Sequence, residues 1–87
     1  MFAIIVYDVS VQRVTKVCHF LRKYMDWIQN SVFEGELTKS QLKEVEVGLK
    51  NIINETEDNV SIYTTHNKEA MTKKTMGTPK ATPEAVI

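Results

Sequence analysis

The feature that most constrains the fold is a continuous apolar run near the start of the chain, residues 2–7, which is rich in branched side chains. Such a run predicts a central β-strand that is covered on both faces or nearly so. The next three residues, Asp8 to Ser10, interrupt it. Ser10 is a suitable N-cap, because its hydroxyl can accept a hydrogen bond from a free amide of a following helix. The chain therefore begins with a buried strand that leads directly into a helix.

Two amphipathic helices are predicted on either side of a segment with strand character. Apolar residues spaced three and four apart predict the first helix over residues 11–25. The second begins at the capping-box pattern of residues 38–41, where a Thr hydroxyl and a Gln amide can bond to the backbone, and runs to about Ile53. Gly48 lies inside this helix at a cost of about 1 kcal/mol relative to Ala, so we expect another element to pack closely against it.

Strand character returns between the helices and after the second one. Residues 26–37 contain two short strand patterns with the polar residues 29–31 between them, which favours a turn or a bulge. Gly35 in the second pattern indicates close approach of another backbone. Residues 60–64 again have the pattern of a strand. The order strand–helix–strand–strand–helix–strand predicts an α+β protein of the ferredoxin-like βαββαβ type, with an antiparallel sheet and both helices on one face.

The C-terminal part lacks this periodicity, and we divide the chain into a ferredoxin-like domain over residues 1–64 and an arm over residues 65–87. Two prolines and a glycine interrupt any long regular element in the arm. Two structures remain open for it. One is a disordered end, and the other is a short strand near residues 74–76 that docks on a sheet edge.

The formal net charge of the 87 residues is zero, which argues against a simple coat of nucleic acid, but the charges are unevenly distributed. Residues 1–25 carry four Lys or Arg side chains and one acidic side chain, whereas residues 26–60 carry three Lys and eight acidic side chains. A folded domain could therefore present a positive and a negative face. Three basic residues are candidates for phosphate contacts, the alternative being a hydrated helix face: Arg13, Lys16 and Lys23.

Cysteine usage and the N-terminal segment bear on the compartment. Cys18 is the only cysteine, so no disulfide can form within the chain, and a lone thiol is typical of the reducing cytosol. The apolar run of residues 2–7 has no basic leader and is too short for an export signal or a membrane span. We therefore expect a cytoplasmic protein with no membrane partner.

Asp8 is the strongest candidate for chemistry, because it ends the predicted central strand and places a carboxylate at the edge of the sheet. Carboxylate oxygens suit Mg²⁺, which keeps several waters and takes one or two carboxylates in proteins. The alternative is a turn aspartate that bonds to local amides. One carboxylate per chain is little for catalysis, but two copies of Asp8 across a dimer axis would suffice to hold a metal and orient water.

Two motifs stand out once the elements are placed: VYDV at residues 6–9 and IQNSVFEGEL at residues 28–37. In this order and at this spacing, in a chain this short, they resemble the CRISPR-associated protein 2 family, the small partner of the CRISPR integrase in spacer acquisition. The resemblance covers residues 1–64 well and the arm loosely. Either motif alone is unspecific, and it is their combination that indicates the family.

The resemblance implies a fold, a site and partners. It implies a ferredoxin-like homodimer in which the arm after Thr65 adds a strand to the partner's sheet, with the CRISPR integrase and nucleic acid as further partners. It also implies that Asp8 is the catalytic, metal-binding aspartate, paired with its copy across the dimer axis. Mg²⁺ would then support endonuclease activity on single-stranded RNA or double-stranded DNA. Tyr7 and Phe33 match positions near that site, and Arg13 matches a basic position that would steady the charge of the phosphate.

Three functions remain open at this point. The first is a Mg²⁺-dependent endonuclease in CRISPR adaptation, and the second is a non-catalytic structural bridge between integrase dimers. The third, of another class, is a ferredoxin-like protein-interaction or regulatory module, since a fold does not fix a function. Trp27 stands where some nuclease-active members have a basic residue, and this difference, with the zero net charge, favours the bridge over the nuclease.

Overall fold

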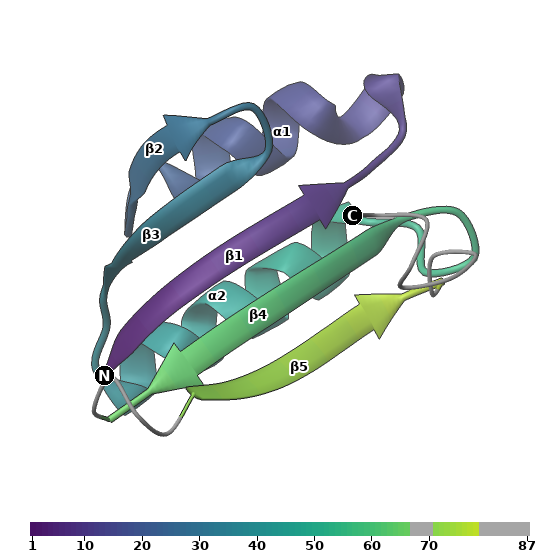
Figure 1. The fold of residues 1–87 in the computed structure, drawn as a ribbon. Helices are drawn as coiled ribbons and strands as arrows, with labels where there is room; N and C mark the ends of the chain where they lie inside the picture. Colours follow the sequence, from purple (N-terminus) through teal and green to yellow (C-terminus); the bar gives the residue numbers. More distant parts are fainter. Residues whose placement is uncertain (67–70, 79–87) are drawn as a thin grey trace.

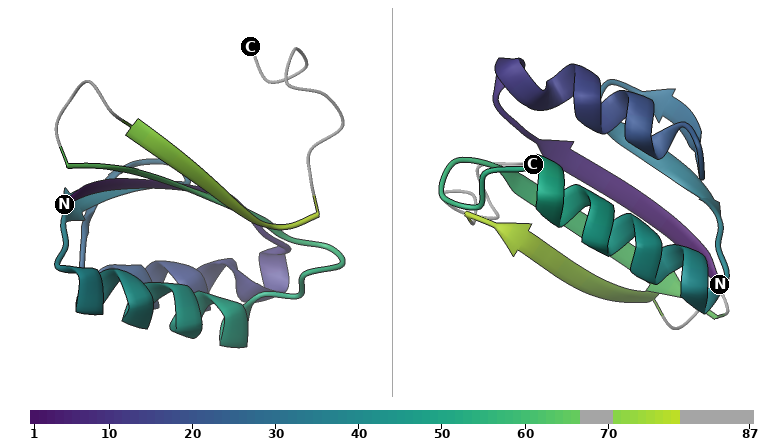
Figure 2. Two further views of the ribbon diagram at one scale, coloured as in Figure 1. Left: turned by 90° about the horizontal axis from the view of Figure 1, so that it is seen from below. Right: turned by 180° about the vertical axis from the view of Figure 1, so that it is seen from behind.

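The computed structural model describes residues 1–66 and 71–78, and it has two layers: an antiparallel sheet and two helices that cover one of its faces (Figure 2). The helices are α1 (Val11–Leu21) and α2 (Lys39–Ile52), and they lie side by side against the sheet. This arrangement confirms the predicted ferredoxin-like α+β fold. No helix in the described ranges is both long and apolar enough to cross a membrane.

Five strands form the sheet, and their order gives each strand its neighbours. In chain order they are β1 (Phe2–Asp8), β2 (Asp26–Gln29), β3 (Val32–Glu36), β4 (Asn59–Thr65) and β5 (Met71–Gly77). Across the sheet the order is β2-β3-β1-β4-β5, and every neighbouring pair is antiparallel (Figure 1). β1 therefore lies at the centre, as its apolar sequence predicts.

Within a single chain, β1 has one face covered by helices and one face that is not. Ala3, Ile5 and Tyr7 point toward the helices and are buried, whereas Val6 and Asp8 are exposed. The prediction of cover on both faces is therefore wrong for the single chain, because both helices cross the same face of the sheet (Figure 2). The opposite face, to which Val6 and Asp8 point, is called the open face below.

Helix α1 begins as predicted and ends earlier. At its N-terminus the Ser10 hydroxyl accepts a hydrogen bond from the Gln12 amide. The helix ends at Leu21 instead of residue 25, because the chain turns there and buries Met25 in the core. A Cβ on Gly35 of β3 would lie 3.4 Å from the Met25 Cα, which confirms the predicted close approach of another backbone.

Strands β2 and β3 form a hairpin with both a turn and a bulge. Asn30 in the turn has a φ of 45°, a left-handed conformation that Asn adopts more readily than most residues. The register of the hairpin shifts between Trp27 and Gln29. The Trp27 indole N–H donates a hydrogen bond of 2.9 Å to the Asn30 carbonyl and so ties the turn to the strand. The irregularity predicted from the polar residues 29–31 is confirmed.

Helix α2 packs against α1 through a glycine. The side chains and backbone amides of Thr38 and Gln41 exchange the hydrogen bonds of a capping box at its N-terminus. Further along, Gly48 faces Phe20 of α1, whose ring occupies the space that a Cβ would need. This contact confirms the predicted close packing at Gly48.

Part of the predicted arm is a strand of the sheet. β5 pairs with β4 along its whole length, with Thr75 opposite Ser61, so the docking predicted near residues 74–76 takes place on the chain's own sheet edge. The exchange of this strand with a partner's sheet stays a prediction, and so does the division of the chain at residue 65. The end of the arm, residues 79–87, lies outside the described residues.

Candidate metal and nucleic-acid site

Asp8 lies at the carboxyl end of β1, on the open face of the sheet. It is exposed, and its backbone stands opposite Asn59 in the register of β1 and β4. Because successive residues of a strand point to opposite faces, Tyr7 points into the core and stacks on Phe33 with ring centroids 6.1 Å apart. Burial raises the pKa of the Tyr7 hydroxyl. The structure therefore separates Tyr7 and Phe33 from the face of Asp8 and gives them a packing role.

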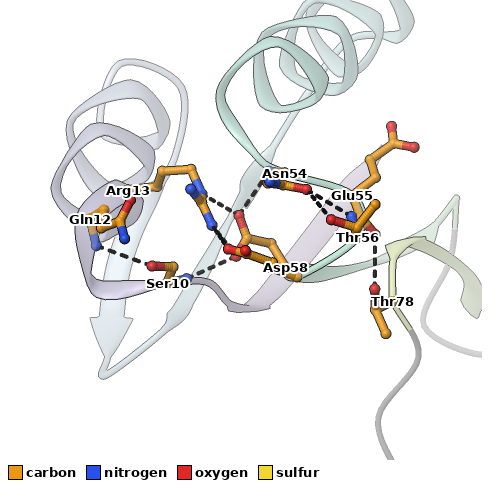
Figure 3. A network of polar contacts seen from close by, with 9 residues as sticks. Ser10, Gln12, Arg13, Asn54, Glu55, Thr56, Asp58 and Thr78 are labelled. Carbon is orange, nitrogen blue, oxygen red and sulfur yellow. Dashed lines mark hydrogen bonds and ion pairs between the residues drawn. The ribbon is translucent and has the colours of Figure 1, made fainter.

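A second aspartate, Asp58, lies directly before β4 and holds a network of polar contacts together (Figure 3). It has no exposed surface, and both of its carboxylate oxygens accept hydrogen bonds. Oδ1 accepts from the Ser10 N–H at 2.9 Å and from Arg13 Nη2 at 3.1 Å. Oδ2 accepts from Arg13 Nε at 2.6 Å and from the Asn54 N–H at 2.9 Å. The carboxylate thus joins the start of α1, the end of α2 and the start of β4.

The charges in this network compensate one another. Arg13 Nη2 also donates to Glu57 Oε1 at 2.7 Å, so one guanidinium bridges two carboxylates. The side-chain hydrogen bonds from Arg13 lower the pKa of Asp58 to about 2, and the bonds to Asp58 and Glu57 raise the pKa of Arg13. Asp58 and Arg13 therefore form an ion pair at neutral pH that is buried on the side of Asp58.

Sequence reasoning missed Asp58 because it is one of several acidic residues in the polar link before β4. Its contact with Arg13 joins residues that are 45 positions apart, and no local pattern encodes such a pair. The available signal was its position next to Asn59, at the start of a strand that pairs with the strand ending in Asp8. That signal needs the topology of the sheet before it can be used.

Comparison with known proteins decides the family. Residues 1–73 match the model of the family described as CRISPR associated protein Cas2. The chain belongs to the Cas2 family. Membership accounts for the two motifs at residues 6–9 and 28–37, and it connects the chain with CRISPR systems. It argues against an unrelated interaction module.

Individual Cas2 relatives are similar over most or all of the chain. "CRISPR-associated endoribonuclease Cas2" of Methanosarcina acetivorans is 46% identical over 87 residues, which is all of both chains. "CRISPR-associated endoribonuclease Cas2 2" of Archaeoglobus fulgidus is 49% identical over 80 residues, covering 92% of this chain and 87% of that protein. A solved structure described as "Crystal structure of cas2" matches with a TM-score of 0.70 at 56% identity, and the match covers 72% of this chain and 71% of that one.

In this Cas2 chain one of the three predicted phosphate-binding residues, Arg13, is bound within the fold. Arg13 donates to Asp58 and Glu57, and its side chain is only 18% exposed. A guanidinium held between two carboxylates has lost most of its outward positive field, so the geometry does not support a direct contact of Arg13 with phosphate. Lys16 and Lys23 are exposed, and their contacts with phosphates stay predictions.

One Cas2 chain supplies one carboxylate to the proposed metal site. Within residues 1–66 and 71–78, no group of three or more His, Cys, Asp or Glu side chains is placed to hold a metal ion. The Asp8 carboxylate is a hard oxygen donor at the exposed end of the central strand, which fits an ion that keeps most of its waters. A second carboxylate would have to come from another copy of the chain, since both oxygens of Asp58 are already bonded within the fold.

Proposed function

We propose that the chain is a homodimeric, Mg²⁺-dependent endonuclease of CRISPR adaptation that hydrolyses phosphodiester bonds in single-stranded RNA or double-stranded DNA. The observation that carries the proposal is Asp8, an exposed carboxylate at the end of the central strand of a chain whose relatives are named endoribonucleases. Its partners would be a second copy of the chain, the nucleic acid and the CRISPR integrase.

The open face of the sheet supports pairing of two copies. It carries Val6, which is 37% exposed and lies two residues before Asp8 on the same face of β1. A chain of 87 residues has a small core and gains stability when such an apolar surface is covered. A twofold axis through this face, near the end of β1, would bring two copies of Asp8 together. Light scattering should give a dimer mass, and a monomer at micromolar concentration would contradict the pairing.

The residues of this chain would bind and orient in the reaction. Bound between two copies of Asp8, Mg²⁺ would supply charge for the phosphate and help to activate water. The position of Asp8 would be fixed for holding the ion, because its backbone pairs with Asn59 of β4 in the sheet. Lys16 and Lys23 would contact phosphates and position the strand without reading its sequence.

A structural bridge between integrase dimers is the second candidate, and the position of Arg13 favours it. The charge that was expected to steady the phosphate is bound by Asp58 and Glu57 instead. A dimer with exposed Lys16 and Lys23 could still hold duplex backbone without cutting it. The two candidates share the family, the dimer and the basic residues, and they differ in whether Asp8 takes part in hydrolysis.

A cleavage assay on labelled single-stranded RNA and duplex DNA separates them. With Mg²⁺ the native chain should cut, and Asp8→Asn should abolish cutting because it removes the charge that holds the ion. Asp26→Asn, at another exposed aspartate at the start of β2, is the matched control and should cut like the native chain. Cleavage that survives Asp8→Asn or EDTA contradicts the nuclease proposal. Nucleic acid that is bound but not cut by the native chain supports the bridge.

A further inference from the structure

We infer that Asp58 and Arg13 are positioning residues that hold Asp8 in place, and that Arg13 serves the site through this pair instead of by binding phosphate. The inference rests on the function proposed for Asp8. Figure 3 shows its basis: the Asp58 carboxylate lies between the turn after β1, which carries Ser10, and the end of α2, which carries Asn54.

The backbone around Asp8 is fixed on both sides. On the strand side, Asp8 stands opposite Asn59 at the last position of the β1–β4 register. On the helix side, the Ser10 N–H donates to Asp58 at 2.9 Å. Only Val9 lies between these two points. Because Asp58 and Asn59 are consecutive, one short piece of chain holds Asp8 from both directions.

Asp58 is itself held from several directions. Its carbonyl accepts a hydrogen bond of 2.8 Å from the Thr78 N–H at the end of β5, and its carboxylate accepts from the Asn54 N–H. The Asn59 side chain donates to the Thr78 carbonyl at 2.7 Å. The support behind Asp8 therefore draws on α2 and β5 as well as on α1 and β4, and a change of the Asp58 side chain would loosen its bonds to the start of α1 and to the chain after α2.

Arg13 completes this support and is not in a position to leave it. It lies in the first turn of α1, three residues after Ser10, and both residues donate to the same carboxylate. Turning the guanidinium toward a phosphate would leave the completely buried Asp58 without its counter-charge. A buried charge without a partner is strongly destabilising. The exposed partner Glu57 adds a second carboxylate, 2.7 Å from Nη2. Arg13 is thus committed to the fold.

The test compares three variants with a matched control. Asp58→Asn keeps the size of the side chain but removes the charge and one acceptor oxygen. Arg13→Gln removes the guanidinium, and Arg13→Lys keeps the charge without the forked pair of donors. Glu57→Gln is the control, because it disturbs only the exposed contact of Arg13. Each variant is measured for kcat and KM in the Asp8-dependent cleavage, for the salt dependence of nucleic-acid binding, and for hydrogen exchange of the Ser10 amide.

Asp58→Asn and Arg13→Gln should lower kcat by about tenfold to hundredfold, since small displacements of a catalytic group have effects of this size. KM and the salt slope of binding should stay native, the Ser10 amide should exchange faster, and Arg13→Lys should recover part of kcat. Glu57→Gln should remain within about twofold of the native rate, because exposed ion pairs contribute little. If Arg13→Gln instead lowers the salt slope by about one and spares kcat, Arg13 is a phosphate contact and the inference is overturned.

The same variants keep this inference separate from the proposed function. If the native chain cuts neither substrate, the nuclease proposal fails. Mn²⁺ then replaces cleavage as the probe of Asp8, because a bound Mn²⁺ ion broadens the NMR signal of the Asp8 amide. Asp58→Asn should then weaken that broadening and speed exchange at Ser10, whereas Glu57→Gln should change neither. An Asp58→Asn chain with native broadening and native exchange at Ser10 overturns the positioning role in either case.

Discussion

Asp8 and Asp58 belong to the same end of the sheet, but their surroundings are opposite. Asp8 is exposed on the open face, whereas Asp58 has no exposed surface and accepts hydrogen bonds from both helices' ends and from Arg13. Asn59 connects them, since it follows Asp58 in the chain and stands opposite Asp8 in the sheet. One aspartate faces outward, and the other holds the fold behind it.

The difference shows what burial demands of a carboxylate. A buried charge must be paired and hydrogen-bonded within the chain, because water cannot solvate it. Asp58 meets this demand with backbone amides and a guanidinium, so its partners are fixed. An exposed carboxylate has no such requirement, because water can solvate it, and Asp8 is exposed. The same residue type thus has fixed partners within the fold in one place, and in the other it is the carboxylate proposed to bind Mg²⁺.

The largest expected effect is a loss of stability on removing the buried carboxylate. Asp58→Ala should lower the free energy of unfolding by about 3 kcal/mol, near the lower end for broken buried ion pairs because the partner guanidinium reaches solvent. Asp8→Ala should change it by less than about 0.5 kcal/mol, as at other exposed sites. Urea denaturation at neutral pH measures both. Equal losses at the two positions would remove the contrast between them.

Acid should act on the two aspartates differently. Arg13 holds the pKa of Asp58 at about 2, below its ordinary value of 3.8. The unfolded chain therefore takes up this proton first, so the contribution of Asp58 to stability is complete above about pH 4 and is lost as the pH falls toward 2. Between about pH 5 and pH 2, a range that includes both pKa values, the free energy of unfolding should fall more steeply with decreasing pH for the native chain than for Asp58→Asn. Identical slopes would show that Asp58 titrates normally.

Local patterns were enough to predict the elements of the fold. The N-cap at Ser10, the capping box of residues 38–41 and the turn at Asn30 each depend on neighbouring residues, and the structure has all three. The early end of α1 was not predictable in this way. It depends on Met25 reaching the core beside Gly35, which is a contact between elements.

The candidate site shows the same difference between features that depend on neighbouring residues and contacts between distant elements. The place of Asp8 at the exposed end of β1 was predictable from the sequence, because the end of an apolar run identifies it without knowledge of any other element, and its role in the site stays a prediction. The contact of Arg13 with Asp58 was not predicted from the sequence. The two residues are 45 positions apart, and they meet only because α1 packs against the start of β4. Charge counted along the chain cannot distinguish a guanidinium facing solvent from one that compensates a buried carboxylate.

Lys16 of α1 and Lys23 in the turn after α1 should contribute to nucleic-acid binding, whereas Arg13, which is bound to Asp58, should not. Replacing exposed Lys16 and Lys23 together by Ala should weaken nucleic-acid binding and reduce the salt slope by about two, one for each lost phosphate contact. Stability should stay within about 0.5 kcal/mol of the native chain, since both side chains lie on the surface. Binding measured at several salt concentrations tests this. An unchanged slope would place the nucleic acid on another surface.

The smallest expected effect is the response of the folded protein to Mg²⁺. An ion that binds the native state at Asp8 stabilises it by about 1.4 kcal/mol when its concentration is tenfold above its Kd. Asp8→Asn should abolish this gain, whereas Asp58→Asn should retain part of it, because the buried carboxylate supports the ligand without being one. Asp26→Asn, with its substitution on the far edge strand β2, should keep the whole gain. A gain that persists in Asp8→Asn would place the ion elsewhere, and the contrast between the two aspartates would then be one of stability alone.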